Sequence, residues 1–150
     1  MPPRSFRFRP RFRGLAWSAV GVGGALGAVT AVTLGGALLP LATGALGVVL
    51  GAAYLMSPAW KLEVIVDDDA LEVRSARGVR FRLPWTDVIK VVASPSTHTC
   101  FVDGGTPAQS LLVPGEGAPA PYDIEDKPAL VEAILAHVPK EKVQEVATLR

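Results

Sequence analysis

The strongest constraint in this sequence is a run of 47 residues, from Gly14 to Trp60, that contains no Asp, Glu, Lys or Arg. The hydrocarbon core of a bilayer is roughly 30 Å thick and is crossed by about 20 helical residues. A single helix through the whole run would be about 70 Å long at 1.5 Å per residue. The run therefore predicts a membrane protein with two spans.

Glycine and proline indicate where the two spans are separated. Gly35, Gly36 and Pro40 are residues typical of a helix end and a turn. We therefore expect residues 14–60 to form two transmembrane helices, at about 15–34 and 41–57. The alternative, a cleaved signal peptide, has an apolar region of only about 7–15 residues.

Small residues recur at a spacing of four within both predicted helices, at Gly23, Gly27, Gly47 and Gly51. Such faces let two helix backbones approach closely in lipid. We expect them to pack the two arms of the hairpin together; self-association between copies is the alternative. Neither span carries an ionisable side chain, which argues against a transporter or channel.

The N-terminal segment is strongly basic and holds five arginines with no acidic residue: Arg4, Arg7, Arg9, Arg11 and Arg13. Positive flanks stay in the cytoplasm, so residues 1–13 are predicted to be a basic cytoplasmic tail. Two crossings then return residue 61 onwards to the cytoplasm. Phenylalanines alternate with these arginines, which suits a segment lying on anionic headgroups. On that hypothesis Arg7, Arg9, Arg11 and Arg13 contact lipid; the alternative is a disordered tail that only sets topology.

The remainder of the chain, residues 61–150, has the composition of a small soluble domain. It holds ten basic and fourteen acidic residues, a net charge of −4 that argues against nucleic acid as a partner. Cys100 is the single cysteine, so no intramolecular disulfide can form.

Apolar and polar residues alternate along this part, which predicts short strands with one buried face. They are expected at about 62–66, 71–74, 79–83, 88–93, 98–102 and 109–113. Asp67–Asp69 forms the first turn, and Ala76–Gly78 forms a three-residue hairpin loop. This register pairs Val73 with Phe81, Leu71 with Leu83, Glu72 with Arg82, and Arg74 with Arg80.

One amphipathic helix is predicted after the strands, over about 128–138. Asp126 can cap this helix, and Pro128 is tolerated in its first turn. Its apolar stripe consists of Leu130, Val131, Ile134, Leu135 and Val138. Pro139 ends it, and residues 140–150 are predicted to be a C-terminal tail with a loose amphipathic turn.

Two segments resemble the pleckstrin-homology-like (PH-like) domains of bacterial membrane proteins. Leu83-Pro84-Trp85-Thr86-Asp87-Val88-Ile89 is similar to a segment that follows the third strand in that family, and the helix 128–138 matches its C-terminal helix. The resemblance covers residues 61–139 and implies an α+β fold. A two-helix transmembrane hairpin would precede a small antiparallel PH-like β-barrel or sandwich, partly open and capped by an amphipathic helix.

The family resemblance implies a binding or scaffolding role and no catalytic residues. Members that bind phosphoinositides use a basic loop after the first strand, where this chain has three aspartates. We therefore expect a non-enzymatic protein of the bacterial inner (plasma) membrane, multi-pass, with both termini cytoplasmic. Its PH-like domain would serve protein interaction or scaffolding; the alternative is a regulatory or sensor subunit that binds a lipid headgroup or small ligand. Expected partners are membrane lipids and a further protein, or a second copy of the chain.

Potential catalytic and metal-binding residues are few. His98 and Cys100 are two apart on one predicted strand, but two ligands do not make a zinc site. An acidic turn such as Asp67–Asp69 is usually only solvated. No nucleophile–base set and no phosphate-binding glycine loop is present. We expect no enzyme activity, no cofactor and no metal.

The predicted arginine hairpin is the more interesting candidate. The first strand starts directly after the second span and leads away from the membrane, and the second strand returns. Arg74, Arg77 and Arg80 would then lie near the headgroups, with Asp67–Asp69 on the far side. Basic residues beside an anionic leaflet contribute roughly 1 kcal/mol each. The alternative is a solvated hairpin.

Overall fold

The computed structural model describes residues 2–33, 35 and 37–147. The chain divides into two compact units. One is Pro10–Pro58, and the other combines Met1–Arg9 with Ala59–Arg150. The first unit is thus an insertion in the sequence of the second.

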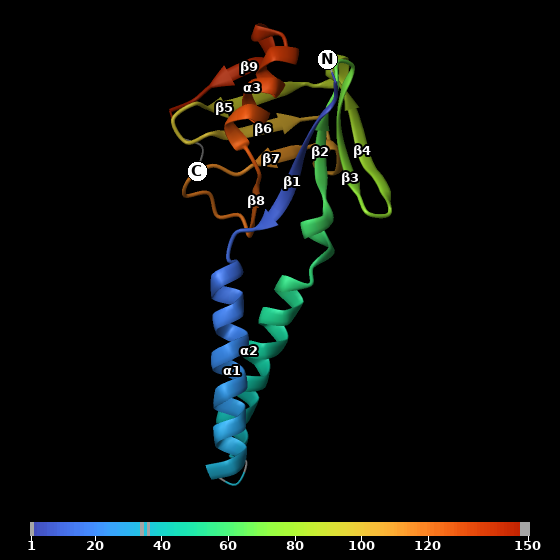
Figure 1. Ribbon diagram of the computed structural model, residues 1–150. Helices are drawn as coiled ribbons and strands as arrows, with labels where there is room; N and C mark the ends of the chain where they lie inside the picture. The colour runs from blue at the N-terminus through green and yellow to red at the C-terminus, as the bar shows by residue number, and fades with distance from the viewer. Residues whose placement is uncertain (1, 34, 36, 148–150) are drawn as a thin grey trace. The chain divides into compact units, whose positions relative to one another are not determined.

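The inserted unit is a helical hairpin (Figure 1). Helix α1 spans Arg13–Thr33 and α2 spans Leu38–Leu55, within a few residues of the predicted bounds. Both are long and apolar enough to cross a membrane, by length and composition. Pro40 was expected in the turn but lies in the first turn of α2, where its missing N–H removes no helical hydrogen bond. Leu34 and Gly36 of the predicted turn lie outside the described residues.

The predicted basic tail is wrong, because most of it is a strand of the other unit. Arg4–Pro10 form β1, which pairs antiparallel with β2 (Glu63–Val66). Phe6 and Phe8 are only 6% and 8% exposed. Alternation of phenylalanine with arginine gives one apolar and one charged face, which is the pattern of a half-buried strand.

The first sheet has the order β4-β3-β2-β1-β8. It adds β3 (Ala70–Ser75), β4 (Gly78–Pro84) and the short β8 (Tyr122–Ile124). Three predicted pairs are confirmed: Val73 with Phe81, Leu71 with Leu83, and Glu72 with Arg82. The fourth is wrong, because a register shift after Val73 sets Arg74 opposite Val79 instead of Arg80. The irregularity separates the two like charges.

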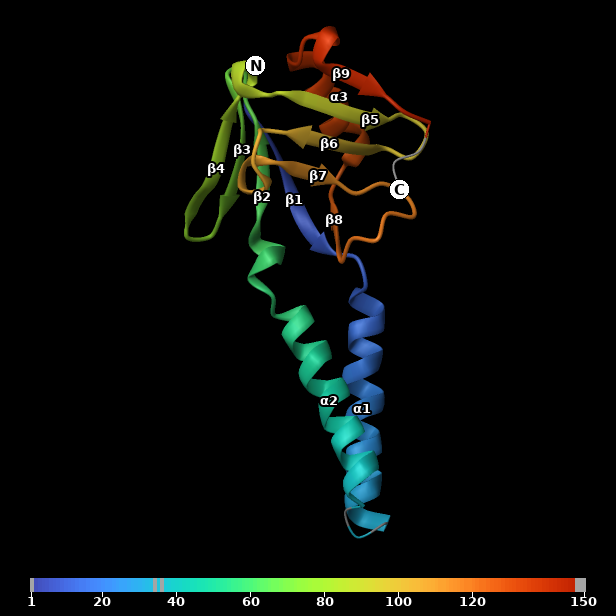
Figure 2. The same ribbon diagram turned by 180° about the vertical axis from the view of Figure 1, so that it is seen from behind.

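The second sheet has the order β7-β6-β5-β9. Its strands are β5 (Lys90–Ser94), β6 (Thr99–Asp103), β7 (Leu111–Val113) and β9 (Val143–Glu145). Strand β9 pairs parallel with β5 and follows the short 3-10 helix η4 (Lys140–Lys142), so the predicted loose C-terminal tail is wrong in this part. The two sheets are not closed, so the fold is α+β with two sheets and not a barrel (Figure 2).

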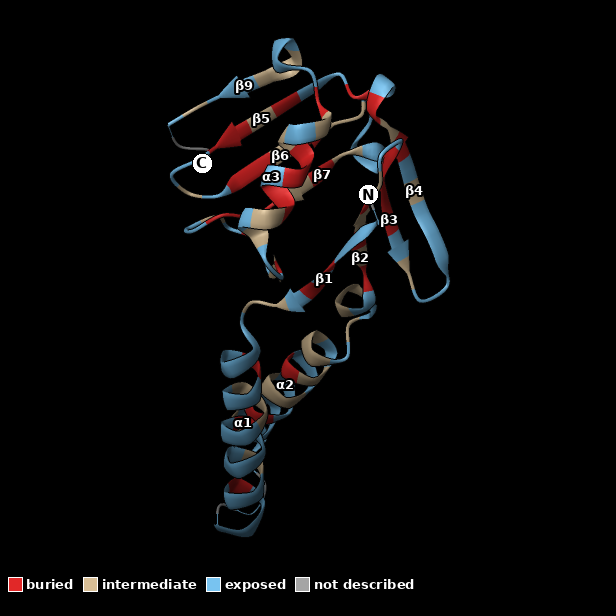
Figure 3. Ribbon diagram, turned by 45° about the horizontal axis from the view of Figure 1, so that its top comes forward, coloured by how far each residue is buried: buried red, intermediate tan, exposed pale blue. Residues whose placement is uncertain are grey.

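Helix α3 (Lys127–His137) packs its apolar side chains into the core shared with both sheets, as Figure 3 shows by burial. Pro128 lies in its first turn as predicted. Asp126 takes the N-cap position, but it adopts φ +50° and its side chain makes no capping hydrogen bond. The predicted stripe holds, with Leu130 and Ile134 fully buried.

Candidate functional site

We call the unit that combines Met1–Arg9 with Ala59–Arg150 the soluble unit, and Pro10–Pro58 the helical unit. The most distinctive part of the soluble unit is one end of its first sheet, which we call the connection end. Arg7, Glu63 and Arg74 lie in one row across β1, β2 and β3. Beyond this row the chain passes to residue 10 and returns from residue 58, and β3 turns into β4 at Ala76-Arg77 (Figure 2). The Asp67–Asp69 turn lies at the opposite end, beside the start of β1. Within this unit the predicted separation of arginine turn and aspartate turn is therefore confirmed.

Three of the seven predicted lipid-contact arginines, Arg7, Arg9 and Arg74, pair with carboxylates of the protein. Arg7 Nε donates to Glu63 Oε1 at 2.9 Å. A guanidinium nitrogen of Arg74 lies 2.7 Å from Glu72 Oε1, and one of Arg82 lies 3.8 Å from Glu72 Oε2. Glu72 is only 8% exposed and anchors both arginines on the outer face of the sheet.

Arg77 and Arg80 differ from these arginines. Among the described residues, neither has a carboxylate within ion-pair distance. Both are exposed, at the turn and in the first part of β4. Of the predicted hairpin set, Arg77 and Arg80 are thus available to an external anion, whereas Arg74 is held by Glu72.

The last two predicted arginines belong to the helical unit. The guanidinium carbon of Arg11 lies 5.9 Å from the centroid of the Phe12 ring. Arg13 is the first residue of α1.

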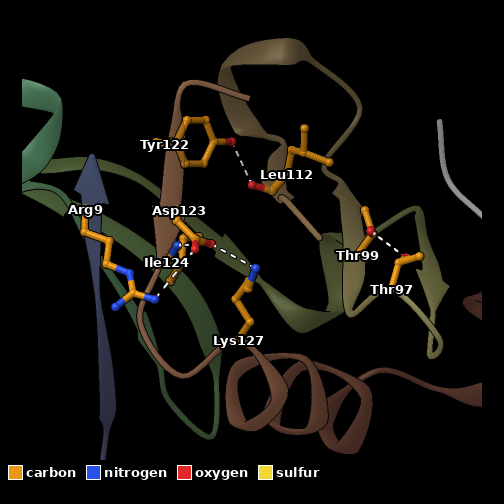
Figure 4. Close-up of polar contacts among 8 residues, drawn as sticks. All are labelled: Arg9, Thr97, Thr99, Leu112, Tyr122, Asp123, Ile124 and Lys127. Atoms are coloured by element: carbon orange, nitrogen blue, oxygen red, sulfur yellow. Dashed lines mark hydrogen bonds and ion pairs between the residues drawn. The ribbon is translucent and has the colours of Figure 1, made fainter. Parts of the chain in front are cut away.

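Arg9 contributes to a charge cluster that joins β1, β8 and α3 (Figure 4). Asp123 Oδ2 lies 3.6 Å from Arg9, and its Oδ1 lies 3.0 Å from Lys127 Nζ. The backbone N–H of Ile124 also donates to Asp123. Burial opposes ionisation of this carboxyl, but these hydrogen bonds and the two cationic charges together lower the pKa of Asp123.

A cavity of about 300 Å³ opens in the soluble unit between β4, η3 (Pro107–Gln109) and β8. Its walls are mostly apolar, and they include Phe8, Leu62, Phe81 and Tyr122. Arg80 is the charged residue of the lining. Phe8 supports the wall, since its ring centroid lies 5.0 Å from that of Tyr122.

The two polar side chains of the lining besides Arg80, Ser110 and Tyr122, are hydrogen-bonded within the protein. Tyr122 Oη donates to Leu112 O at 2.8 Å (Figure 4), and burial raises the pKa of the Tyr122 phenol. Ser110 Oγ donates to Thr106 O at 2.7 Å. Sequence reasoning missed this cavity, because Phe8 was placed in the tail and no strand was predicted at Tyr122–Ile124.

The aspartate end of the sheet is built around Trp85. Its indole N–H donates to Asp67 O at 2.9 Å, and its ring stacks on His137 with centroids 5.1 Å apart. His137 Nε2 lies 3.6 Å from Asp68 Oδ1. Trp85 therefore contributes to the packing of the Asp67–Asp69 turn against α3.

The predicted pairing of His98 with Cys100 on one strand is wrong. His98 lies in the turn before β6 with φ +54°, whereas Cys100 is fully buried in that strand. Burial raises the pKa of the Cys100 thiol to about 12. Within the described part of the chain, no group of three His, Cys, Asp or Glu side chains is placed to hold a metal ion.

In the helical unit, the small residues pack α1 against α2. A Cβ at Gly23 would lie 2.6 Å from Gly44 O, and one at Gly51 would lie 2.8 Å from Ala16 O. Gly47 is also in contact, at 3.3 Å from Ala19 O. The predicted packing within the hairpin is confirmed at these positions. A Cβ at Gly27 would meet nothing within 4 Å, and Gly44 was not predicted.

Comparison with known proteins finds no protein family, no curated protein and no solved structure that matches the chain significantly.

Proposed function

We propose that this chain is a non-enzymatic integral membrane protein of the bacterial inner (plasma) membrane. The helical hairpin crosses the bilayer twice and displays a PH-like domain at the cytoplasmic surface. The domain serves as a scaffold that binds a protein partner beside the membrane.

The observation that carries this proposal is the insertion of the hairpin between two strands that pair with each other. Strand β1 precedes α1, β2 follows α2, and Phe8 N–H donates to Leu62 O at 3.0 Å. Two directly paired strands must lie on the same side of a membrane. The number of crossings between them is then even, in agreement with two apolar helices.

The orientation rests on charge. Five arginines precede Gly14, and residues 14–60, between them and Lys61, contain no Asp, Glu, Lys or Arg. An excess of arginine on one flank favours retention of that flank in the cytoplasm. Because β1 and β2 pair, the soluble unit follows the arginines to that side.

The strand order supports the PH-like assignment. Two successive antiparallel meanders, β2-β3-β4 and β5-β6-β7, are followed by the amphipathic helix α3. The chain departs from the expected arrangement by adding β1, β8 and β9 to the two open sheets. The domain continues into the hairpin from β1 and resumes from it at β2, two strands that are neighbours in the first sheet.

Extraction in mild detergent, followed by isolation of a C-terminally tagged chain, tests the scaffold role. We expect a protein partner at fixed stoichiometry, bound by the full chain and lost from a tagged variant that ends at Ser57. A partner kept by that helical fragment, or none with the full chain, contradicts the role.

A second candidate, a sensor that binds a lipid, is favoured by the apolar cavity beside Arg80.

A further inference from the structure

The cavity beside β4 and η3 is close along the chain to both ends of the hairpin. Phe8 precedes the first residue of α1, Arg13, by five residues, and Ala59 follows the last residue of α2, Leu55, by four. At no more than about 3.6 Å per residue, these two lining residues lie within about 18 Å and 14 Å of the helix ends. This inference rests on the proposed function, because it requires the hairpin to be in a membrane.

The chemistry of the lining suits an alkyl chain better than a polar small molecule. Polar ligands are oriented by several uncommitted donors and acceptors. Here the hydroxyls of Ser110 and Tyr122 already donate to backbone carbonyls of the protein. The other walls are aromatic and aliphatic, and they offer contact with methylene groups.

Arg80 adds one positive charge to this apolar space. Among the described residues no carboxylate neutralises it. Arg74 is not part of the lining; it lies opposite Val79 and pairs with Glu72. A guanidinium binds phosphate oxygens in a bidentate manner, so an anionic headgroup is the matching partner.

We propose that this cavity takes part of one acyl chain of an anionic phospholipid, with the headgroup phosphate against Arg80. Its volume of about 300 Å³ is at the lower end of ligand pockets, which measure roughly 300–1,000 Å³. That space accommodates a segment of one chain and not a whole lipid. The lipid is drawn from the cytoplasmic leaflet.

Photolabelling of the full chain in nanodiscs tests this proposal. The probe is phosphatidylglycerol with a diazirine in one acyl chain, diluted in unlabelled phosphatidylcholine. We expect labelled peptides from residues 79–82 and 107–112 besides those from 13–55. Label confined to 13–55 overturns the acyl-chain site and leaves the membrane anchor intact, whereas absence of label from 13–55 overturns the proposed function.

Two comparisons distinguish binding of lipid in the cavity from general contact of the soluble unit with lipid. Ala108→Trp fills the mouth of the cavity from an exposed position and should abolish the label at 79–82. Gln109→Trp, at the next exposed residue outside the lining, should leave it unchanged. Arg80→Gln should lower labelling by the phosphatidylglycerol probe about fivefold. A phosphatidylcholine probe that carries the same diazirine should lose far less labelling in this variant. Equal labelling in all three variants contradicts the proposal.

Discussion

At the scale of single residues, partner carboxylates decide which arginines remain available. Glu72 holds Arg74 and Arg82, Glu63 holds Arg7, and Asp123 holds Arg9. A count of arginines in the sequence cannot distinguish these from Arg77 and Arg80, because the carboxylates that pair with Arg7, Arg9 and Arg82 come from other strands. The candidate surface is therefore smaller than the predicted set.

Asp123 should stabilise the soluble unit in a pH-dependent way. Its folded pKa is lowered by Lys127, Ile124 N–H and Arg9, so its contribution is present above the unfolded pKa of about 3.9 and is lost as pH falls through the folded pKa. Asp123→Asn should lower the free energy of unfolding by about 0.5 kcal/mol at pH 7, since the pair is partly solvated. The difference from wild type should decrease as pH falls below the unfolded pKa and through the lowered folded pKa.

Urea unfolding of the full chain in mild detergent measures this effect, with Glu116→Gln as the control. Glu116 is exposed and has no ion pair among the described residues. A difference that is the same at pH 7 and pH 3 would show that Asp123 does not act through its charge.

Gly23 should be intolerant of even one methyl group. A Cβ there would lie 2.6 Å from Gly44 O and 3.2 Å from Val48 N, both backbone atoms. Gly23→Ala should weaken packing of the hairpin by about 1–3 kcal/mol, whereas Gly24→Ala meets nothing within 4 Å and should be tolerated. The distance between spin labels at residues 15 and 56, followed during an SDS titration, measures how strongly α1 packs against α2. Equal midpoints for the two variants would contradict this packing.

At the scale of elements, β1 changes the interpretation of the N-terminus most. Residues 1–13 are predicted to be a tail because their five arginines match the signal that keeps a flank of a membrane span in the cytoplasm. The alternation of Phe6 and Phe8 with arginine also matches a strand, and this pattern was assigned to lipid contact instead. What decides between the two is pairing with β2, which lies more than fifty residues away and cannot be read locally.

Phe6→Ala should therefore destabilise the soluble unit by about 3–5 kcal/mol, through lost burial and the cavity left behind. Phe12→Ala is the matched control, because Phe12 is 46% exposed and lies outside the sheet. Thermal unfolding of the purified full chain, followed by near-ultraviolet circular dichroism, measures both. A tail without structural role would give the two variants the same melting temperature.

The other elements were predictable to different degrees. The helices α1, α2 and α3 and the strands β2 to β7 follow from strong periodicity, proline and glycine signals. Strands β8 and β9 are three residues each and gain their pairing from the assembled sheets, so they leave little local pattern. The bulge that separates Arg74 from Arg80 was missed for a similar reason, because side-chain alternation alone does not fix a hairpin's register.

The turn between β3 and β4 should respond to anionic lipid through Arg77 and Arg80. A polarity-sensitive dye on Ala76→Cys in the full chain should shift to shorter wavelength when nanodiscs contain phosphatidylglycerol instead of phosphatidylcholine alone. The double change Arg77→Gln and Arg80→Gln removes about 1 kcal/mol of attraction per residue near a membrane surface and should abolish the shift.

Lys90→Gln with Lys140→Gln makes the same change in net charge elsewhere on the soluble unit. These two lysines are exposed in or beside the second sheet. The shift should persist in this control. Loss of the shift in both double variants would indicate general electrostatic attraction in place of contact at the turn.

At the scale of the whole molecule, the chain is one domain interrupted by a helical hairpin. Residues 10–58 separate β1 from β2, yet these strands pair along four residues each. Folding of the soluble unit therefore closes a loop that contains both helices. Under the proposed membrane insertion, an odd number of crossings between β1 and β2 is incompatible with their pairing.

The most direct test of this account is the sidedness of single cysteines in intact cells. Ala37→Cys probes the region between the helices, and Glu116→Cys probes the soluble unit; both positions are exposed. Native Cys100 is fully buried with its thiol pKa raised to about 12, so it reacts little. We predict that an impermeant maleimide labels residue 37 from outside and residue 116 only after permeabilisation. Labelling of both from the same side would contradict the account.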